Sequence, residues 1–303
     1  MNAAHPFSSL ATEASHPRSA DLDLLATEDL VRMTLEEGLA AFRACRAASV
    51  EIAHVADLAA DALRSGGRLV YAGAGTSGRL AMLDAVELAP TFGFPAERVP
   101  VLLAGGDAAM FRAQEGAEDR SSDGAARVRS LGVGVRDLVV GVTASGRTPF
   151  VTAALAEART LGARTAAVTC NPLPSGVIVD VHVLLATGAE VLAGSTRMNA
   201  GTATKMALNA MSLAAMVRIG KVYGNRMVDL RAGSEKLRDR AQRLVRELGR
   251  VDDARADAAL RAADGHVKTA ILMVRRDLTA REARRLLRLH GDSLRAALGR
   301  VGS

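Results

Sequence analysis

The sequence predicts an α/β protein with a doubly wound, mostly parallel sheet, followed by a small all-helical C-terminal domain. Two observations predict this fold class. Short apolar runs alternate with segments of helical periodicity as far as about residue 219, and only helical periodicity follows Gly233. Strands that are apolar along their whole length are typical of parallel sheets, because helices cover both faces of such a sheet. A chain of 303 residues is long enough for this arrangement.

The predicted elements of the sheet domain follow in order along the chain. Apolar residues at helical spacing cover about 29–64, and the pair Gly66-Gly67 ends this pattern. The five predicted strands are the apolar runs 68–72, 99–103, 138–143, 165–169 and 181–186. The predicted helices between and after them are about 77–88, a polar helix through Glu118, 149–161 and about 202–219.

The C-terminal region shows only helical patterns. Its predicted helices are 235–248, 254–263, 267–275, 281–290 and 293–298. Thr279 stands three residues before Glu282, a capping-box pattern that predicts where the fourth of these helices begins. We therefore expect three parts, which are a loosely ordered or partner-bound segment over 1–23, the sheet domain with its N-terminal helices over 24–248, and the helical domain over 249–303.

The charge of the chain is unevenly distributed. Lys and Arg outnumber Asp and Glu by 39 to 33, and the formal net charge of +6 invites a nucleic-acid partner. However, residues 231–303 hold 18 Lys or Arg against 10 Asp or Glu, so the rest of the chain has a net charge of −2. Six Phe, two Tyr and no Trp leave few aromatic platforms for stacked bases. We expect no nucleic-acid partner and interpret the basic helix face around Arg281 as solvated.

Other classes of protein are set aside on similar grounds. No apolar run approaches the roughly 18–20 residues that a membrane-spanning helix needs. The N-terminus lacks the basic start and apolar core of a secretory signal. Cys45 and Cys170 make neither a disulfide framework nor a metal cluster, and no two histidines stand at metal-ligand spacing. We expect a cytoplasmic protein with no membrane contact and no metal, in which Cys170 is a buried structural residue.

Two predicted strands end in loops suited to an anion. The loops read GAGTSGR (Gly73–Arg79) and TASGRTP (Thr143–Pro149). Ligands of doubly wound sheets bind beyond the carboxyl ends of the strands. Each loop contains hydroxyl-bearing and small residues and is followed by a predicted helix. The free N–H groups at the N-terminus of such a helix favour a phosphate. The candidate phosphate-binding residues are Gly75, Thr76, Ser77, Ser145, Gly146, Arg147 and Thr148.

Other interpretations of the first loop stay open. Gly73, Gly75 and Gly78 formally fit the dinucleotide fingerprint, but the acidic residue expected roughly 20 positions later, Glu97, precedes its strand instead of ending it. No Gly-Lys-Ser/Thr element supports a P-loop, and both loops are also compatible with simple tight turns. Hydroxyls at two strand ends favour a monophosphorylated small molecule as the ligand.

Longer motifs around these loops resemble a known family. YAGAGTSGRLAMLDAVELAPTFG (Tyr71–Gly93) and GAEVLAGSTRMNAGTATKMALN (Gly188–Asn209) are similar to the N-acetylmuramic acid 6-phosphate etherases. That family belongs to the sugar-isomerase (SIS) superfamily and is similar to the glucokinase regulatory protein. Shorter matches extend the resemblance over nearly the whole chain, at Glu115–Asp119, Gly141–Val151, Cys170–Pro172, Gly220–Leu230 and, more faintly, Lys268–Val274.

The resemblance implies a SIS fold and an activity. The family removes the D-lactyl ether of N-acetylmuramic acid 6-phosphate, which gives N-acetylglucosamine 6-phosphate and D-lactate during cell-wall recycling. The resemblance also implies no metal or organic cofactor, a cytoplasmic location and a homodimer. It assigns the proton donor to Glu87 and the base to Glu118, and it adds Ser195, Thr196 and Arg197 to the substrate-binding residues.

Two carboxyl groups suit this chemistry. The ether at C3 of the sugar is β to the C1 aldehyde of the open-chain form, so the C2 proton is acidic and elimination is the accessible route. A base takes that proton and an acid protonates the departing oxygen, each contributing roughly 10²–10⁴-fold in rate, before water adds back at C3. Glu87 and Glu118 follow neighbouring predicted strands, an arrangement that favours one shared cleft.

The sequence differs from the usual motifs of the family at two places. Val86, Leu88 and Ala89 flank Glu87 atypically, and Asn199 stands where the family's RMKAGT pattern has lysine. Two other functions stay open, a phosphosugar-sensing SIS regulator and an aldose–ketose phosphosugar isomerase. The presence of both family glutamates and the absence of a helix-turn-helix unit before the sheet domain favour the etherase.

Overall fold

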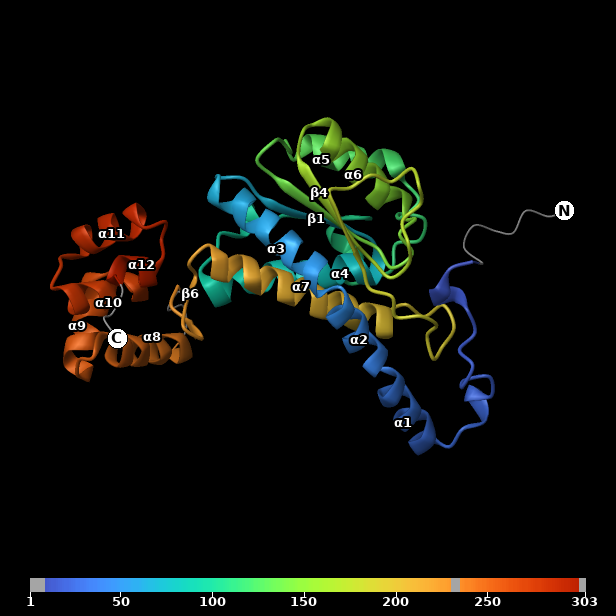
Figure 1. The fold of residues 1–303 in the computed structure, drawn as a ribbon, viewed down its shortest axis with the longest axis horizontal. Helices are drawn as coiled ribbons and strands as arrows, with labels where there is room; N and C mark the ends of the chain where they lie inside the picture. The colour runs from blue at the N-terminus through green and yellow to red at the C-terminus, as the bar shows by residue number, and fades with distance from the viewer. Residues whose placement is uncertain (1–8, 230–234, 300–303) are drawn as a thin grey trace. The chain divides into compact units, whose positions relative to one another are not determined.

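The computed structural model describes residues 9–229 and 235–299 (Figure 1). The described residues form two compact units. The sheet unit comprises those within Met1–Ala85 and Glu97–Ser212, and the helical unit comprises those within Val86–Ala96 and Leu213–Ser303.

Five parallel strands form the sheet, in the order β2-β1-β3-β4-β5. The strands are β1 Leu69–Gly73, β2 Val101–Leu103, β3 Leu138–Val142, β4 Arg164–Thr169 and β5 Val181–Leu184. Every residue of β1 and β3 is buried, as expected when helices cover both faces. The predicted doubly wound parallel sheet is confirmed. Because all five strands run in the same direction, the predicted anion loops begin at the same edge.

Helices cover both faces of the sheet. The helices of this part of the chain are α1 Thr27–Glu37, α2 Leu39–Ala47, α3 Ser49–Arg64, α4 Gly75–Phe92, α5 Ser121–Ser130, α6 Pro149–Thr160 and α7 Asn199–Arg218, with the short 3₁₀ helices η1 Ala11–Glu13, η2 Leu22–Leu24, η3 Ala96–Arg98 and η4 Asp107–Met110. Figure 1 shows α5 and α6 together on one face of the sheet and α3 on the other. Phe150 of α6 is fully buried and belongs to the same apolar core as Val70 of β1 and Val139 of β3.

Two predicted helices differ from the structure. The helical pattern over 29–64 is divided among α1, α2 and α3. The predicted helix through Glu118 is wrong, because η4 is followed by turns up to the start of α5. Gly105, Gly106 and Gly116 have φ values of +83°, +71° and +68°, a left-handed conformation that an α-helix does not contain.

The N-terminal segment contributes to the core of the sheet unit. Residues 1–8 of the predicted loose segment 1–23 lie outside the described residues. In the remainder, η1 and η2 form, and Leu10 and Thr12 are buried, with 4% and 1% of their surface exposed. At least this part of the segment is packed against the fold.

The helical unit has its own apolar core. Its helices are α8 Glu235–Gly249, α9 Asp253–Ala262, α10 Val267–Arg276, α11 Ala280–Leu289 and α12 Leu294–Leu298, and it contains the antiparallel strands β6 Val222–Tyr223 and β7 Arg226–Met227. The predicted capping box is present, with the Glu282 N–H donating to Thr279 Oγ1 and the Thr279 N–H donating to Glu282 Oε2. α8 packs against α9 and α10, so this unit includes residues before the predicted boundary at 249. The two short strands were not predicted.

A partly buried ion cluster lies in the helical unit. Lys268 of α10 has only 3% of its side chain exposed, and its Nζ lies 2.7 Å from Asp292 Oδ2 and 3.0 Å from Asp229 Oδ2. Lys221 forms ion pairs with the same two carboxylates. The buried Lys268 and the partly buried Lys221 therefore face two carboxylates, which offsets the cost of removing the Lys268 charge from water.

A carboxylate near the start of β3 connects it to β1 in the sheet unit. Asp137 accepts hydrogen bonds from the backbone N–H of Arg68 at 2.8 Å, from Arg68 Nη2 at 2.8 Å and from the Gly134 N–H at 3.0 Å. Burial acts to raise the pKa of Asp137, but the donors of Arg68 and Gly134 outweigh it and hold this pKa below its usual value.

We predict that Asp137→Asn lowers the free energy of unfolding by about 2 kcal/mol at neutral pH, because a charge-assisted acceptor becomes a neutral amide. The lowered pKa means that this stabilisation is present above the unfolded-state pKa and is lost as the pH falls through the folded-state pKa. Urea unfolding of both proteins between about pH 7 and about pH 3 measures the difference, which we expect to shrink toward acid pH. A difference that does not change with pH would contradict a contribution from the Asp137 charge.

Candidate functional site

The first anion loop lies where β1 meets α4. A Cβ added to Gly73 would lie 2.7 Å from the Gly78 Cα, and a Cβ added to Gly78 would lie 2.4 Å from Leu103 Cδ1. Only glycine therefore permits the helix to start so close to the strands. The N–H groups of Gly75–Ser77 occupy the first turn of α4, where the helix itself supplies no acceptor and its dipole is positive. The loop is suited to an anion.

Hydroxyl groups organise the second anion loop, between β3 and α6. Thr143 Oγ1 lies 2.7 Å from Thr148 Oγ1 and 3.3 Å from Ser145 Oγ. The Arg147 backbone N–H donates to Ser145 Oγ at 3.1 Å, and Gly146 closes the turn with a φ of +71°. Arg147 Nε is buried and has no hydrogen-bond partner among the described residues. This donor is thus available to a ligand, and guanidinium groups favour phosphates and carboxylates.

The structure brings Glu118 to the first anion loop. Glu118 and Gly75 line one cavity of about 180 Å³, and Arg79 and Gln114 form part of its wall. The Glu118 carbonyl accepts a hydrogen bond from the Phe150 N–H at 2.9 Å, which ties this segment to the start of α6. The exposed Glu118 side chain therefore belongs to a wall of the cavity at the α4 N-terminus, although the helix predicted to carry it is absent.

Glu87 lies farther along α4. It is twelve residues beyond the first residue of the helix, or about 18 Å along the helix axis. Glu87 is exposed and does not line the cavity described above. One turn earlier, Asp84 is buried and accepts hydrogen bonds from the Tyr71 hydroxyl at 2.8 Å and the Ser212 hydroxyl at 2.9 Å, which ties α4 to β1 and α7. The presence of Glu87 and Glu118 in one cleft stays a prediction.

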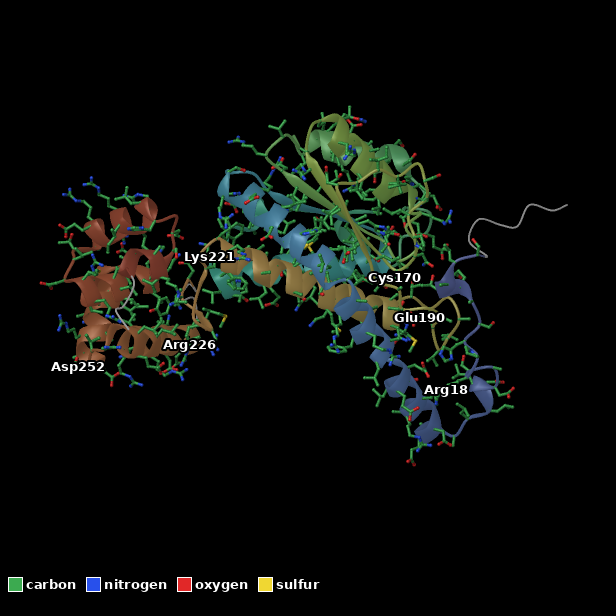
Figure 2. The ribbon with its side chains drawn as sticks, viewed as in Figure 1. Arg18, Cys170, Glu190, Lys221, Arg226 and Asp252 are labelled. Carbon is green, nitrogen blue, oxygen red and sulfur yellow. The ribbon has the colours of Figure 1, made fainter. Side chains whose placement is uncertain are left out.

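A buried carboxylate closes the segment that carries Ser195–Arg197. Glu190, labelled in Figure 2, has no exposed surface. Its two carboxylate oxygens accept hydrogen bonds from the N–H groups of Asn199 and Ala200, both at 2.9 Å, at the first turn of α7. Glu190 was not predicted from the sequence, although an acidic residue within the otherwise apolar GAEVLAG stretch was a signal for a buried functional or structural carboxylate.

The first anion loop and the segment that carries Ser195–Arg197, which we call the third segment, lie close together at Gly201. Thr76 Cγ2 and the Thr196 carbonyl oxygen would lie 3.6 Å and 3.4 Å from a Cβ at this position. Asn199, where the family usually has lysine, is buried, and its Nδ2 donates to the Glu37 carbonyl at 3.3 Å. The Asn199 side chain is therefore held at the end of α1.

Cys170 is buried, as predicted, and lies near the start of α7 (Figure 2). Its Sγ lies 3.8 Å from the Ala200 carbonyl oxygen. Burial raises the pKa of the Cys170 thiol to about 12, so the thiolate is strongly disfavoured. Among the described residues, no group of three or more His, Cys, Asp or Glu side chains is placed to hold a metal ion.

The chain is similar in sequence to proteins of one activity. Residues 51–159 match the model of the glucokinase regulatory protein N-terminal SIS domain. The N-acetylmuramic acid 6-phosphate etherase of Deinococcus radiodurans is 47% identical over 289 residues, which are 95% of each chain. The chain belongs to the N-acetylmuramic acid 6-phosphate etherase family. The family membership predicted from the motifs is thus confirmed.

Two more etherases show the same extent of similarity. The N-acetylmuramic acid 6-phosphate etherase of Erwinia tasmaniensis is 46% identical over 291 residues, 96% of this chain and 95% of its own. The one from Yersinia pestis is 48% identical over 290 residues, 95% of this chain and 98% of its own. The similarity to the etherases therefore includes both the sheet unit and the helical unit.

Solved structures of sugar-phosphate enzymes also match the chain. The phosphoheptose isomerase from Francisella tularensis has a TM-score of 0.48 and 19% identity, and the match covers 63% of this chain and 98% of the isomerase. The phosphoheptose isomerase from Neisseria gonorrhoeae has a TM-score of 0.45 and 20% identity, covering 62% of this chain and 98% of its own.

None of the described helices of this etherase-family chain is both long and apolar enough to cross a membrane.

We predict that Cys170 resists iodoacetamide in the native protein at about pH 8, because the reactive thiolate is a minute fraction of a thiol with this pKa. Peptide mass spectrometry after timed alkylation measures the modification. The same reaction in urea serves as the control, since unfolding exposes the thiol. Modification of native Cys170 as fast as in urea would show an accessible, activated cysteine instead.

Proposed function

We propose that this chain is an N-acetylmuramic acid 6-phosphate etherase, which cleaves the D-lactyl ether to give N-acetylglucosamine 6-phosphate and D-lactate. The observation that carries the proposal is 46–48% identity to proteins of that name over at least 95% of this chain. Two loops suited to a phosphate at the carboxyl edge of the sheet support it. The proposal includes a cytoplasmic location, as the family resemblance implies.

The phosphate of the substrate binds at the two anion loops. Gly75–Ser77 offer N–H groups and hydroxyls at the start of α4, and Ser145–Thr148 offer the same kinds of donor at the start of α6. The unpartnered Nε of Arg147 supplies a charge-assisted donor. Ser195–Arg197 complete the substrate site from the third segment, which contacts Thr76 through Gly201.

Two glutamates perform the acid–base chemistry. Glu118 takes the C2 proton of the open-chain sugar, the electron pair of that C–H bond forms the C2–C3 double bond, and the C3–O bond breaks. The departing lactyl oxygen takes a proton from Glu87. Water then adds at C3 and gives a proton to the ionised Glu87, while Glu118 returns its proton to C2. The position of Glu118 beside the α4 N-terminus supports its role near the sugar phosphate.

We predict that Glu87→Gln and Glu118→Gln each reduce D-lactate release by at least about 10²-fold, because an amide neither donates nor accepts the required proton. Both variants still bind N-acetylmuramic acid 6-phosphate in calorimetry. In deuterated water, Glu87→Gln still exchanges the C2 proton and Glu118→Gln does not, which separates the two roles.

The control for these variants is Glu97→Gln, which changes an exposed glutamate outside the cavity lining and retains wild-type turnover. Wild-type turnover by Glu87→Gln or Glu118→Gln would overturn the assignment of that residue. If the wild-type protein bound the sugar phosphate but released no lactate, the etherase assignment would be wrong. The phosphosugar-sensing function would then be the better assignment.

We also propose that the chain forms a homodimer and that a second copy completes the site. Glu87 does not line the cavity that holds Glu118. It is flanked on α4 by Leu83 and Val86, which are 47% and 51% exposed, and Leu35 of α1 is 71% exposed. Apolar side chains exposed in such numbers favour a protein partner, and a second copy is the partner that the family resemblance implies.

We predict that activity per chain falls on dilution from about micromolar to about nanomolar concentration, because mass action separates the two copies. Mass photometry of the same samples measures the dimer fraction, which falls in parallel with the activity. Monomers with undiminished activity would show that one chain holds the complete site.

A further inference from the structure

A short N-terminal segment reaches the carboxyl edge of the sheet. We call residues Leu10–Glu13, which include η1, the N-terminal strap. Its residues Leu10 and Thr12 are buried, although the segment has little regular structure to hold it in place. Its contacts must therefore come from other parts of the sheet unit.

Asn171 supplies the first of these contacts. It follows β4, is 1% exposed, and its Oδ1 accepts a hydrogen bond from the Ala11 N–H at 2.9 Å. Its Nδ2 donates to Thr12 Oγ1 at 2.9 Å and to the Ala144 carbonyl at 3.0 Å. Both amide hydrogens are thus used, one by the strap and one by the residue that precedes Ser145 in the second anion loop.

The strap also contacts the third segment of the site. The Gly194 N–H donates to the Thr12 carbonyl at 3.2 Å, and Gly194 directly precedes Ser195. Gly194 has a φ of +74°, and a Cβ there would lie 3.0 Å from Glu13 Oε2. The hydroxyl of Thr12 therefore connects through Asn171 to one loop, and the carbonyl of Thr12 connects to the other.

We propose that the N-terminal strap sets the separation of the two substrate loops, with Thr12 and Asn171 as positioning residues for the sugar phosphate. The proposal rests on the proposed function in that these loops bind the substrate. Buried donors and acceptors are costly to leave unpaired, so the hydrogen bonds of Asn171 and Thr12 are satisfied together only when both loops are in place. When the loops are already ordered before the substrate binds, less of the binding free energy is lost in ordering them.

The test compares Thr12→Val with Thr12→Ser. Valine keeps the shape of the buried side chain but leaves an Asn171 N–H unpaired, whereas serine keeps the hydroxyl. We expect Thr12→Val to raise KM for N-acetylmuramic acid 6-phosphate about tenfold while kcat stays within about twofold, and Thr12→Ser to restore KM. Assays are run well below the unfolding temperature of every variant.

The matched control is Thr165→Val. Thr165 is also fully buried and also hydrogen-bonded through its hydroxyl, to Asp180, but it lies near the amino end of β4, away from the loops. A loss of stability alone affects both valine variants, whereas a positioning role changes KM only for Thr12→Val. An equal KM for Thr12→Val and the wild-type protein would overturn the proposal.

A second measurement does not depend on activity. Hydrogen exchange followed by mass spectrometry should show faster exchange in Thr12→Val at both Ser145–Thr148 and Ser195–Arg197, and no such change in Thr165→Val. Unchanged exchange in either loop would refute the strap. If the wild-type protein released no lactate while the loops still responded to Thr12→Val, the etherase assignment would fail and the strap would stand.

Discussion

The parallel direction of the five strands is the constraint on which the rest of the sheet unit depends. It places the ends of β1, β3 and β4 at one edge, where three chain segments leave the sheet and many main-chain polar groups need partners. Glycine contacts between β1 and α4, the Glu190 carboxylate at α7 and the Asn171 amide behind the second loop each satisfy part of that need. They also bring Thr76, in the first turn of α4, close to Gly201, in the first turn of α7. Free N–H groups and hydroxyls at this edge make it suited to a sugar phosphate.

The basic excess of the chain belongs to its C-terminal residues and not to the sheet unit. Residues 231–303, with 18 Lys or Arg against 10 Asp or Glu, supply the positive excess. In the helical unit, Lys221 and Lys268 are paired with Asp229 and Asp292. In the second anion loop, the donors are neutral hydroxyls and backbone N–H groups, together with the guanidinium of Arg147. Total charge therefore says little about the ligand, because paired surface and core ions do not act at the site.

Most regular elements were predictable because their signals are local. β1, β3 and the helices α9 to α11 lie within one or two residues of their predicted bounds, since apolar runs, periodicity and the Thr279 capping box act over a few neighbouring residues. The segment before Glu118 was mispredicted as a helix, because its polar composition fits a surface helix while the left-handed glycines that exclude one show their effect only in the folded backbone. Glu190 and Asn171 were within recognised motifs, but their roles depend on distant partners.

The sequence by itself determined the succession of strands and helices, the hydroxyl-rich loops at two strand ends and the family of the chain. Each of these is encoded in contiguous residues. Only the tertiary structure placed Glu118 beside Gly75, buried Glu190 against the first turn of α7, and joined Thr12 to Asn171. The last contact spans 159 residues of chain. Such bonds form because buried polar groups must find partners wherever packing brings them, and no short stretch of sequence contains that information.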